Sequence, residues 1–215
     1  MPPVAEHGDD AVIFDFSGVV VSSAFSAITA VLGDQLDRDA AMELLVGPYD
    51  RDTDHPWHQV ERGEMTMMDW VSHIDAEAAD RGLVVDWKAM GRVFKELVVH
   101  DVIVDRIRAL RAEGYRVALL TNNIAEGSDT WRKMIPVDEL FEVVVDSSAV
   151  GMRKPDPRIY QLTLDLLGGI EPARAVFLDD HPGNVAGARS AGLAAIVVDD
   201  PEDAVAELDA LLAAG

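Results

Sequence analysis

The stretch AVIFDFSGVV, residues 11–20, joins a short β-branched run to a polar residue at its end. Four similar runs follow along the chain: YRVALL, EVVVD, RAVFLD and AAIVV. Continuous apolar runs of this length are typical of strands buried on both faces of a parallel sheet. Helical patterns lie between most of them, at 102–114, 157–169 and 184–192. The alternation predicts an α/β fold with a doubly wound, parallel, Rossmann-like sheet.

One long segment, residues 22–98, interrupts this alternation with helical patterns and no buried strand pattern. Within it, Thr66 and Asp69 resemble a helix capping box. We therefore expect a core domain made of residues 1–21 and 99–215 and a helical cap domain inserted after the first strand. In an open α/β sheet, ligands bind beyond the carboxyl ends of the strands, where the strand order reverses. The insert is expected to cover that crevice.

The composition argues against several classes of partner and site. The chain has 215 residues, with 18 Lys and Arg against 39 Asp and Glu, which gives a formal net charge of −21. Such a charge repels nucleic acid and anionic lipid, so neither is expected as a partner. The absence of cysteine excludes disulfides, thiolate metal sites and cysteine nucleophiles. No run approaches the roughly 18 apolar residues of a membrane span and no signal-peptide pattern is found, so we expect a cytoplasmic protein. For its oligomeric state we expect a monomer or a homodimer.

Polar residues follow the predicted strands: Asp15 the first, Thr121 the second, Lys154 the third, and Asp179 and Asp180 the fourth. Each alone is typical of a cap or a surface turn, but a parallel sheet gathers these strand ends at one edge. Clustered carboxylates need a shared cation, and oxygen ligands suit Mg²⁺. A carboxylate can attack phosphorus, while a hydroxyl and an ammonium neutralise phosphoryl oxygens. The set predicts phosphoryl transfer.

The motifs DFSGVV, LLTNN, GMRKPDPRIY and VFLDDHPGNVAGARSAG resemble those of the haloacid dehalogenase-like (HAD) hydrolase superfamily, in order and spacing across nearly the whole chain. They are most similar to the phosphatase group that includes the N-terminal domains of soluble epoxide hydrolases. The resemblance implies hydrolysis of a small phosphate ester through an aspartyl phosphate on Asp15. It also implies that Thr121 and Asn122 bind the phosphoryl group and that Lys154 is the charge clamp.

The same resemblance implies a Mg²⁺ site. Its ligands would be Asp15, the backbone carbonyl of Ser17 and Asp179, with Asp180 assisting and Asn184 supporting them. Ser17 is the departure from the family, because most of its phosphatases carry a second Asp at this position as general acid and base. Serine cannot replace it, since its pKa is far too high for proton transfer at neutral pH.

Position 17 leaves alternatives open. A phosphatase with this serine would need either a better leaving group or another proton donor. The segment 50–64, which reads as a loop, contains His55 and His58, and either could face the substrate and supply the proton. Dehalogenases of the superfamily also lack the second Asp, although halide displacement does not need the metal that Asp179 and Asp180 imply. The third alternative is a regulatory module that binds phosphate and Mg²⁺ but turns over poorly.

Overall fold

The computed structural model of the chain describes residues 7–214, except the side chains of residues 26, 27, 93, 94, 128 and 129. Among the described residues, five strands form one parallel sheet in the order β3-β2-β1-β4-β5. The strands are β1 (Ala11–Phe14), β2 (Arg116–Thr121), β3 (Val143–Asp146), β4 (Ala175–Asp179) and β5 (Ala194–Val197). The expected doubly wound parallel sheet is confirmed.

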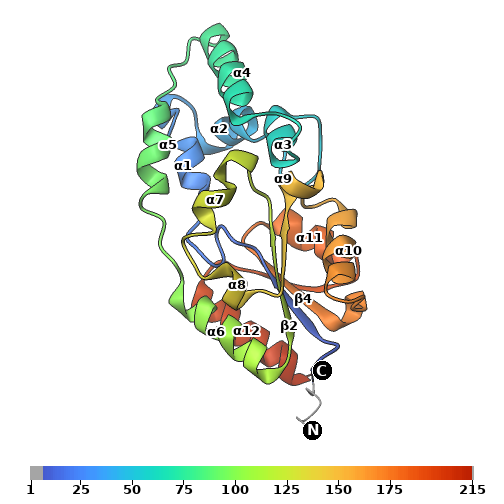
Figure 1. Ribbon diagram of the computed structural model, residues 1–215. Helices are drawn as coiled ribbons and strands as arrows, with labels where there is room; N and C mark the ends of the chain where they lie inside the picture. The colour runs from blue at the N-terminus through green and yellow to red at the C-terminus, as the bar shows by residue number, and fades with distance from the viewer. Residues whose placement is uncertain (1–6, 215) are drawn as a thin grey trace.

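Helices cover both faces of the sheet (Figure 1). On one face, α6 (Asp101–Glu113), α8 (Val137–Leu140) and α12 (Pro201–Ala214) pack on alternate strand residues such as Val12 and Phe14. On the other face, α10 (Pro157–Leu166) and α11 (Pro182–Ser190) pack on the intervening residues such as Ile13. Both faces of each central strand are therefore buried, which explains their unbroken apolar runs.

The segment 22–98, here the α1–α5 segment, lies beyond one end of the sheet (Figure 1). Its helices are α1 (Phe25–Thr29), α2 (Arg38–Leu45), α3 (Pro56–Glu61), α4 (Met67–Asp80) and α5 (Trp87–Phe94). They surround a hydrophobic cluster of their own, centred on Leu45, Trp70 and Ile74. Thr66 caps α4 by accepting a hydrogen bond from the backbone N–H of Asp69, as expected. The division into core and cap domains stays a prediction.

The remaining helical elements are short. They are α7 (Ser128–Trp131), α9 (Ser147–Val150) and the 3₁₀ turns at Gly33–Gln35, Ala125–Gly127 and Pro172–Arg174. Among the helices in the described part of the chain, we find none with the length and apolar character to cross a membrane.

Candidate active site

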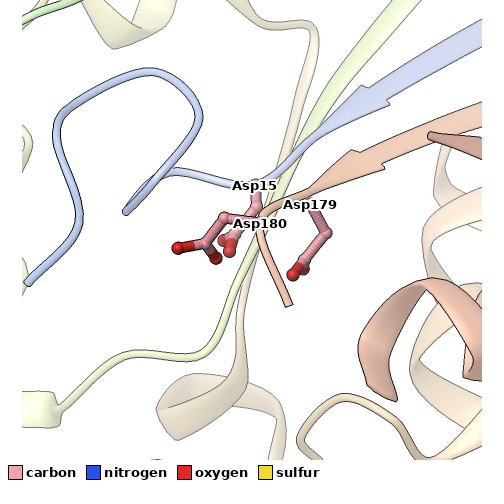
Figure 2. Close-up of side chains that lie close together, drawn as sticks. All are labelled: Asp15, Asp179 and Asp180. Atoms are coloured by element: carbon pink, nitrogen blue, oxygen red, sulfur yellow. The ribbon is translucent and has the colours of Figure 1, made fainter. Parts of the chain in front are cut away.

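The carboxylate cluster lies where the strand order reverses. β1 pairs with β2 on one side and with β4 on the other, and Phe14 is in register with Leu178, so Asp15 and Asp179 follow at neighbouring positions. Figure 2 shows the side chains of Asp15, Asp179 and Asp180 at the ends of these two strands. One carboxylate oxygen of each lies within 4.8 Å of those of the other two. The sheet therefore gathers residues that are 164 positions apart in the chain, since β1 and β4 are neighbours.

Lys154 holds two of these carboxylates together. Its side chain is fully buried, and its Nζ lies 2.8 Å from Asp15 Oδ1 and 2.6 Å from Asp179 Oδ2. The third acceptor is the carbonyl oxygen of Leu120, at 3.0 Å. Burial lowers the pKa of Lys154, but the two carboxylates outweigh burial and the net pKa is raised. The amine is therefore a permanent cation inside the site.

One cation is too few for the cluster. Burial raises the pKa of Asp15 well above its usual range, Lys154 opposes this, and the charges of Asp179 and Asp180 add to the rise. Burial, followed by the charge of Asp179, raises the pKa of Asp180 to about 7. Neighbouring carboxylates that resist ionisation in this way fit a divalent cation bound by hard oxygen ligands, of which Mg²⁺ is an example.

The Asp179 carboxylate is held in place from its own loop. Asp179 Oδ1 accepts hydrogen bonds from the backbone N–H of His181 at 2.8 Å and from Asn184 Nδ2 at 3.0 Å. The Asn184 Oδ1 atom is buried and has no hydrogen-bond partner among the described residues. This unpaired acceptor beside three carboxylates is a further feature that a bound cation, or its water, would satisfy.

Two of the expected phosphoryl binders differ in what their side chains do. Thr121 ends β2, is buried, and lines the same cavity as Asp15. The Asn122 side chain, by contrast, is engaged with the backbone of Lys154, donating to its carbonyl at 3.0 Å and accepting from its N–H at 2.8 Å. The Asn122 side chain therefore positions Lys154, and phosphoryl binding by Asn122, through its backbone, stays a prediction.

Ser17 faces the cavity but also has a local structural partner. Its Oγ accepts a hydrogen bond from the backbone N–H of Ala24 at 2.9 Å, just before α1 begins. The next residue, Gly18, has φ +88°, and a Cβ there would meet the Asp180 carboxylate at 2.0 Å. A side chain at position 18 would thus push Asp180 out of the cluster, which accounts for the glycine.

His55 and His58 do not line the cavity, contrary to their expected role in substrate binding. His55 Nδ1 accepts from the Trp57 N–H and so caps α3, a helix in the segment 50–64 that the sequence had suggested to be a loop. His58 is fully buried, and its Nδ1 accepts from the Thr53 N–H at 3.0 Å. Burial, with the charge of Arg153 adding to it, lowers the pKa of His58 to about 3. Both rings serve the fold of this segment.

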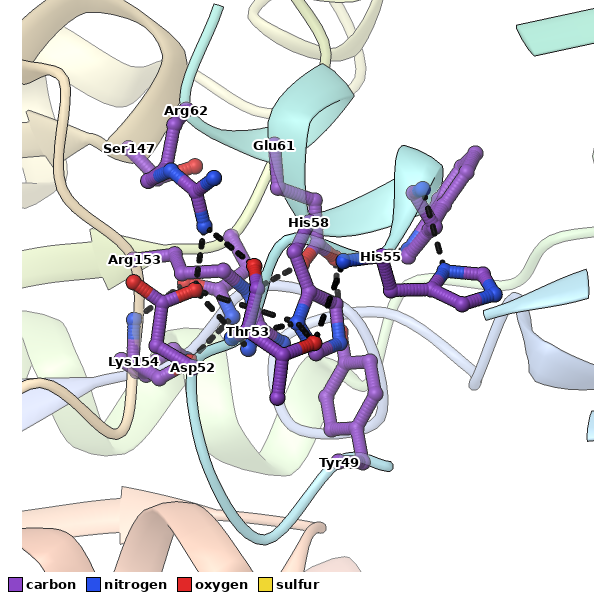
Figure 3. A network of polar contacts seen from close by, with 12 residues as sticks. Tyr49, Asp52, Thr53, His55, His58, Glu61, Arg62, Ser147, Arg153 and Lys154 are labelled. Atoms are coloured by element: carbon purple, nitrogen blue, oxygen red, sulfur yellow. Dashed lines mark hydrogen bonds and ion pairs between the residues drawn. The ribbon is translucent and has the colours of Figure 1, made fainter. Parts of the chain in front are cut away.

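The residues of the α1–α5 segment that do reach the cavity include three the sequence did not single out as site residues: Tyr49, Trp57 and Glu61. Glu61 Oε1 accepts from the Tyr49 hydroxyl at 2.7 Å and from Trp57 Nε1 at 3.0 Å. Its Oε2 accepts from Arg153 Nε at 2.6 Å, and Arg153 is fully buried beside Lys154 (Figure 3). The motif GMRKPDP contains Arg153, but no local signal in the sequence names its partner.

Asp15 lies at the base of a cavity of about 350 Å³ between the sheet edge and the α1–α5 segment. Ser17, Thr121, Asn122, Asp180 and Asn184 share its wall. The rest of the wall is mostly apolar and comes from both parts of the chain: Phe25, Ile28 and Trp57 from the α1–α5 segment, and Ile124, Trp131 and Met134 from the sheet side. The Asp15 carboxylate thus opens onto a space that fits an organic group.

Comparison with known proteins adds relatives to this geometry. The chain is 36% identical over 209 residues to acyl-CoA dehydrogenase family member 10 of Mus musculus, covering 94% of this chain and 19% of that protein. It is 28% identical over 212 residues to bifunctional epoxide hydrolase 2 of Rattus norvegicus, covering 91% of this chain and 37% of that protein. The chain therefore spans well under half the length of these relatives. The second similarity confirms the expected likeness to epoxide hydrolases.

A solved structure and a family model agree with the fold. A HAD family enzyme from Bacteroides thetaiotaomicron, solved with magnesium and inorganic phosphate, is similar with a TM-score of 0.60 and 21% identity, covering 87% of this chain and 93% of that one. The model of the haloacid dehalogenase-like hydrolase family matches residues 10–192. A match over that length, on a parallel sheet with its carboxylates at the point of strand reversal, means that the chain belongs to the haloacid dehalogenase-like hydrolases.

Proposed function

We propose that this hydrolase is a Mg²⁺-dependent phosphatase that acts on a small organic phosphate through an aspartyl phosphate on Asp15. The observation that carries the proposal is the pairing of Lys154 with both Asp15 and Asp179, in a cluster that Asp180 completes. A buried carboxylate next to a fixed cation and a set of oxygen ligands suits attack on a phosphoryl group, whose charge must be neutralised in the transition state. The α1–α5 segment would act as a cap over this site.

The bonds of Asp15 indicate which oxygen attacks. Asp15 Oδ1 accepts from Lys154 Nζ at 2.8 Å and from the Phe16 N–H at 2.7 Å. Within the described residues, Asp15 Oδ2 accepts no hydrogen bond, so this oxygen is the one available to phosphorus. The two donors on Oδ1 orient the carboxylate and leave Oδ2 free for in-line attack. Asp15 thus acts as nucleophile and Lys154 as its orienting cation.

The remaining residues stabilise charge. Asp15, Asp179 and Asp180, with the Ser17 carbonyl, would hold Mg²⁺, which when bound supplies positive charge for the phosphoryl oxygens. Thr121 lies at the end of β2 on the same cavity, where its hydroxyl can donate to a phosphoryl oxygen. Asn122 keeps the Lys154 backbone in place through its two hydrogen bonds. Water from the cavity then attacks phosphorus, which releases inorganic phosphate and restores the Asp15 carboxylate.

The test is phosphate release from a broad panel of phosphate esters by the purified chain, with Mg²⁺ or with EDTA. We expect release with Mg²⁺ only, and none from Asp15→Asn, because an amide cannot form the acyl phosphate. Asp199→Asn, a change at an exposed aspartate outside the site, is the matched control and should be fully active. Unchanged activity in Asp15→Asn would refute the nucleophile assignment.

A halide-release assay with 2-chloropropionate belongs to the same experiment. Full activity in EDTA together with halide release would replace the phosphatase by the dehalogenase alternative. Phosphate and Mg²⁺ binding without release from any ester would instead favour the regulatory module.

A further inference from the structure

We infer that the site acts on phosphates whose leaving oxygen departs without being protonated, namely acyl, enol or aryl phosphates. The inference rests on the proposed phosphatase function and names the substrate class of that site. It follows from a search of the cavity for a group that could give a proton to a departing alkoxide. Loss of such a group costs about 10²–10⁴-fold on ordinary alkyl phosphates.

Position 17 offers no acid. The Ser17 hydroxyl faces the cavity next to Asp15, where the leaving oxygen would lie, but a hydroxyl is far too weak an acid to protonate it in the transition state. Its Oγ also accepts the Ala24 N–H, which directs the side chain toward the start of α1.

The two histidines that could have replaced it lie outside the cavity wall. The Nδ1 atoms of both rings accept backbone N–H groups, His55 from Trp57 and His58 from Thr53. An accepting nitrogen carries no proton, so in each ring one nitrogen is already assigned to the fold. The His58 Nε2 atom is buried without a partner in the described part of the chain, and it cannot reach a ligand there.

In the proposed function the carboxylates of the cluster hold Mg²⁺ in their ionised form, so they carry no proton for the leaving oxygen. Besides them, the described residues that line the cavity include two ionisable side chains, Tyr49 and Glu61. The Tyr49 hydroxyl donates its proton to Glu61 Oε1 at 2.7 Å. Glu61 accepts in addition from Trp57 Nε1 and from Arg153 Nε, so both of its oxygens are acceptors and it presents no proton to the cavity. Figure 3 shows Glu61 and Arg153 as part of a larger polar network that also includes Asp52. Burial also raises the pKa of Tyr49 well above its usual range.

The rest of the described wall is mainly apolar, with Phe25, Ile28, Trp131 and Met134 among its members. Such a wall contacts an organic group but provides no proton. A delocalised anion such as a carboxylate or phenolate is less costly to leave against apolar surface than a localised alkoxide. Both the missing acid and the wall therefore select a leaving group that is a weak base.

The reaction balances without a protein acid. Asp15 Oδ2 forms a bond to phosphorus as the bond from phosphorus to the leaving oxygen breaks, and the electron pair departs as a carboxylate, enolate or phenolate. Water then attacks phosphorus, inorganic phosphate leaves, and the proton of the water goes to solvent. Because every substrate gives the same intermediate on Asp15, the identity of the leaving group affects kcat/KM, which reports the first step.

The test measures kcat/KM for three phosphates of similar size: para-nitrophenyl, phenyl and benzyl phosphate. We expect a steep decrease along this series, with benzyl phosphate at least about 100-fold below phenyl phosphate. Ser17→Asp should raise the ratio of kcat/KM for benzyl phosphate to kcat/KM for para-nitrophenyl phosphate by up to about 10²–10⁴-fold. Ser17→Asn is the matched control, because Asn has the size of Asp but no acidic proton, and it should show no gain in kcat/KM on benzyl phosphate.

A native enzyme that hydrolyses benzyl phosphate as fast as phenyl phosphate overturns the inference and leaves the phosphatase proposal standing. Release of phosphate from none of the three refutes the phosphatase proposal itself. Glu61→Gln and Tyr49→Phe complete the design. A loss above about tenfold that is confined to benzyl phosphate in either of these variants would identify a hidden donor and overturn the inference.

Discussion

The buried pair of Glu61 and Arg153 makes the sharpest prediction about stability. Both side chains are almost completely withdrawn from solvent, at 3% and 0% exposed. Arg153 Nη1 has a long contact of 3.3 Å to the Arg51 carbonyl and lies 3.8 Å from Asp52 Oδ1, while its Nη2 has no partner among the described residues. Glu61 is thus the main partner that neutralises the charge of the buried Arg153 guanidinium. Removing one partner of such a pair typically costs about 3–5 kcal/mol, because the other charge is left buried alone.

We therefore expect Glu61→Gln to lower the free energy of unfolding by about 3–5 kcal/mol, out of the roughly 5–15 kcal/mol of a typical protein. For a chain of this length, the thermal midpoint should fall by about 6–20 °C. The measurement is thermal and urea unfolding followed by circular dichroism. Glu64→Gln is the matched control: its carboxylate pairs with Arg62 but is 51% exposed, so we expect a loss of about 0–1 kcal/mol.

A second variant separates charge burial from loss of shape. Glu61→Leu combined with Arg153→Met removes both charges, and replacing a whole buried pair by apolar groups is often neutral. The double variant should therefore be more stable than Glu61→Leu alone. A loss below about 1 kcal/mol in Glu61→Gln, or no recovery in the double variant, would refute the argument that Arg153 depends on Glu61.

Three further outcomes are expected at the site. Asn122→Ala removes both hydrogen bonds to the Lys154 backbone, so steady-state kinetics should show kcat reduced by about 10–100-fold, because a small displacement of the clamp is costly. His55→Gln should leave the pH profile of kcat/KM unchanged, since His55 lies outside the cavity wall; a lost limb in that profile would contradict this. Mg²⁺ binding should strengthen as pH rises from about 6 to 8, because Asp180, with a pKa of about 7 before metal binds, must first lose its proton. Titration calorimetry checks this, and Asp180→Asn should flatten the dependence.

The sheet and the carboxylate cluster could be predicted because their signals are local and repeated. An apolar run predicts each strand. The polar residues that follow the strands can then be placed together, because parallel strands end at one edge of the sheet. Asp15 and Asp179 therefore meet although β2 and β3 intervene in the chain. Lys154 follows the same logic, because the loop after β3 returns toward β1 and β4.

The contact between Glu61 and Arg153 could not be predicted in this way. The two residues are 92 positions apart, and neither lies at the end of a strand. An Arg before Lys154 and a Glu between Val60 and Arg62 are each typical of a solvated surface. Their burial depends on how α3 lies against the sheet edge, near α9, and that is a property of tertiary packing.

The positions of His55 and His58 outside the cavity wall have a geometric cause. His55, Trp57 and His58 lie within four residues. If this segment is taken as a loop, their three side chains are expected on one shared surface. The chain instead forms a helix over Pro56–Glu61, begun by the proline and capped by His55. On a helix, residues four apart share a face and adjacent residues do not, so Trp57 and Glu61 turn to the cavity while His58 turns into the protein. Helix formation in this short stretch thus decides that, of these residues, the cavity receives an indole and an engaged carboxylate and neither histidine.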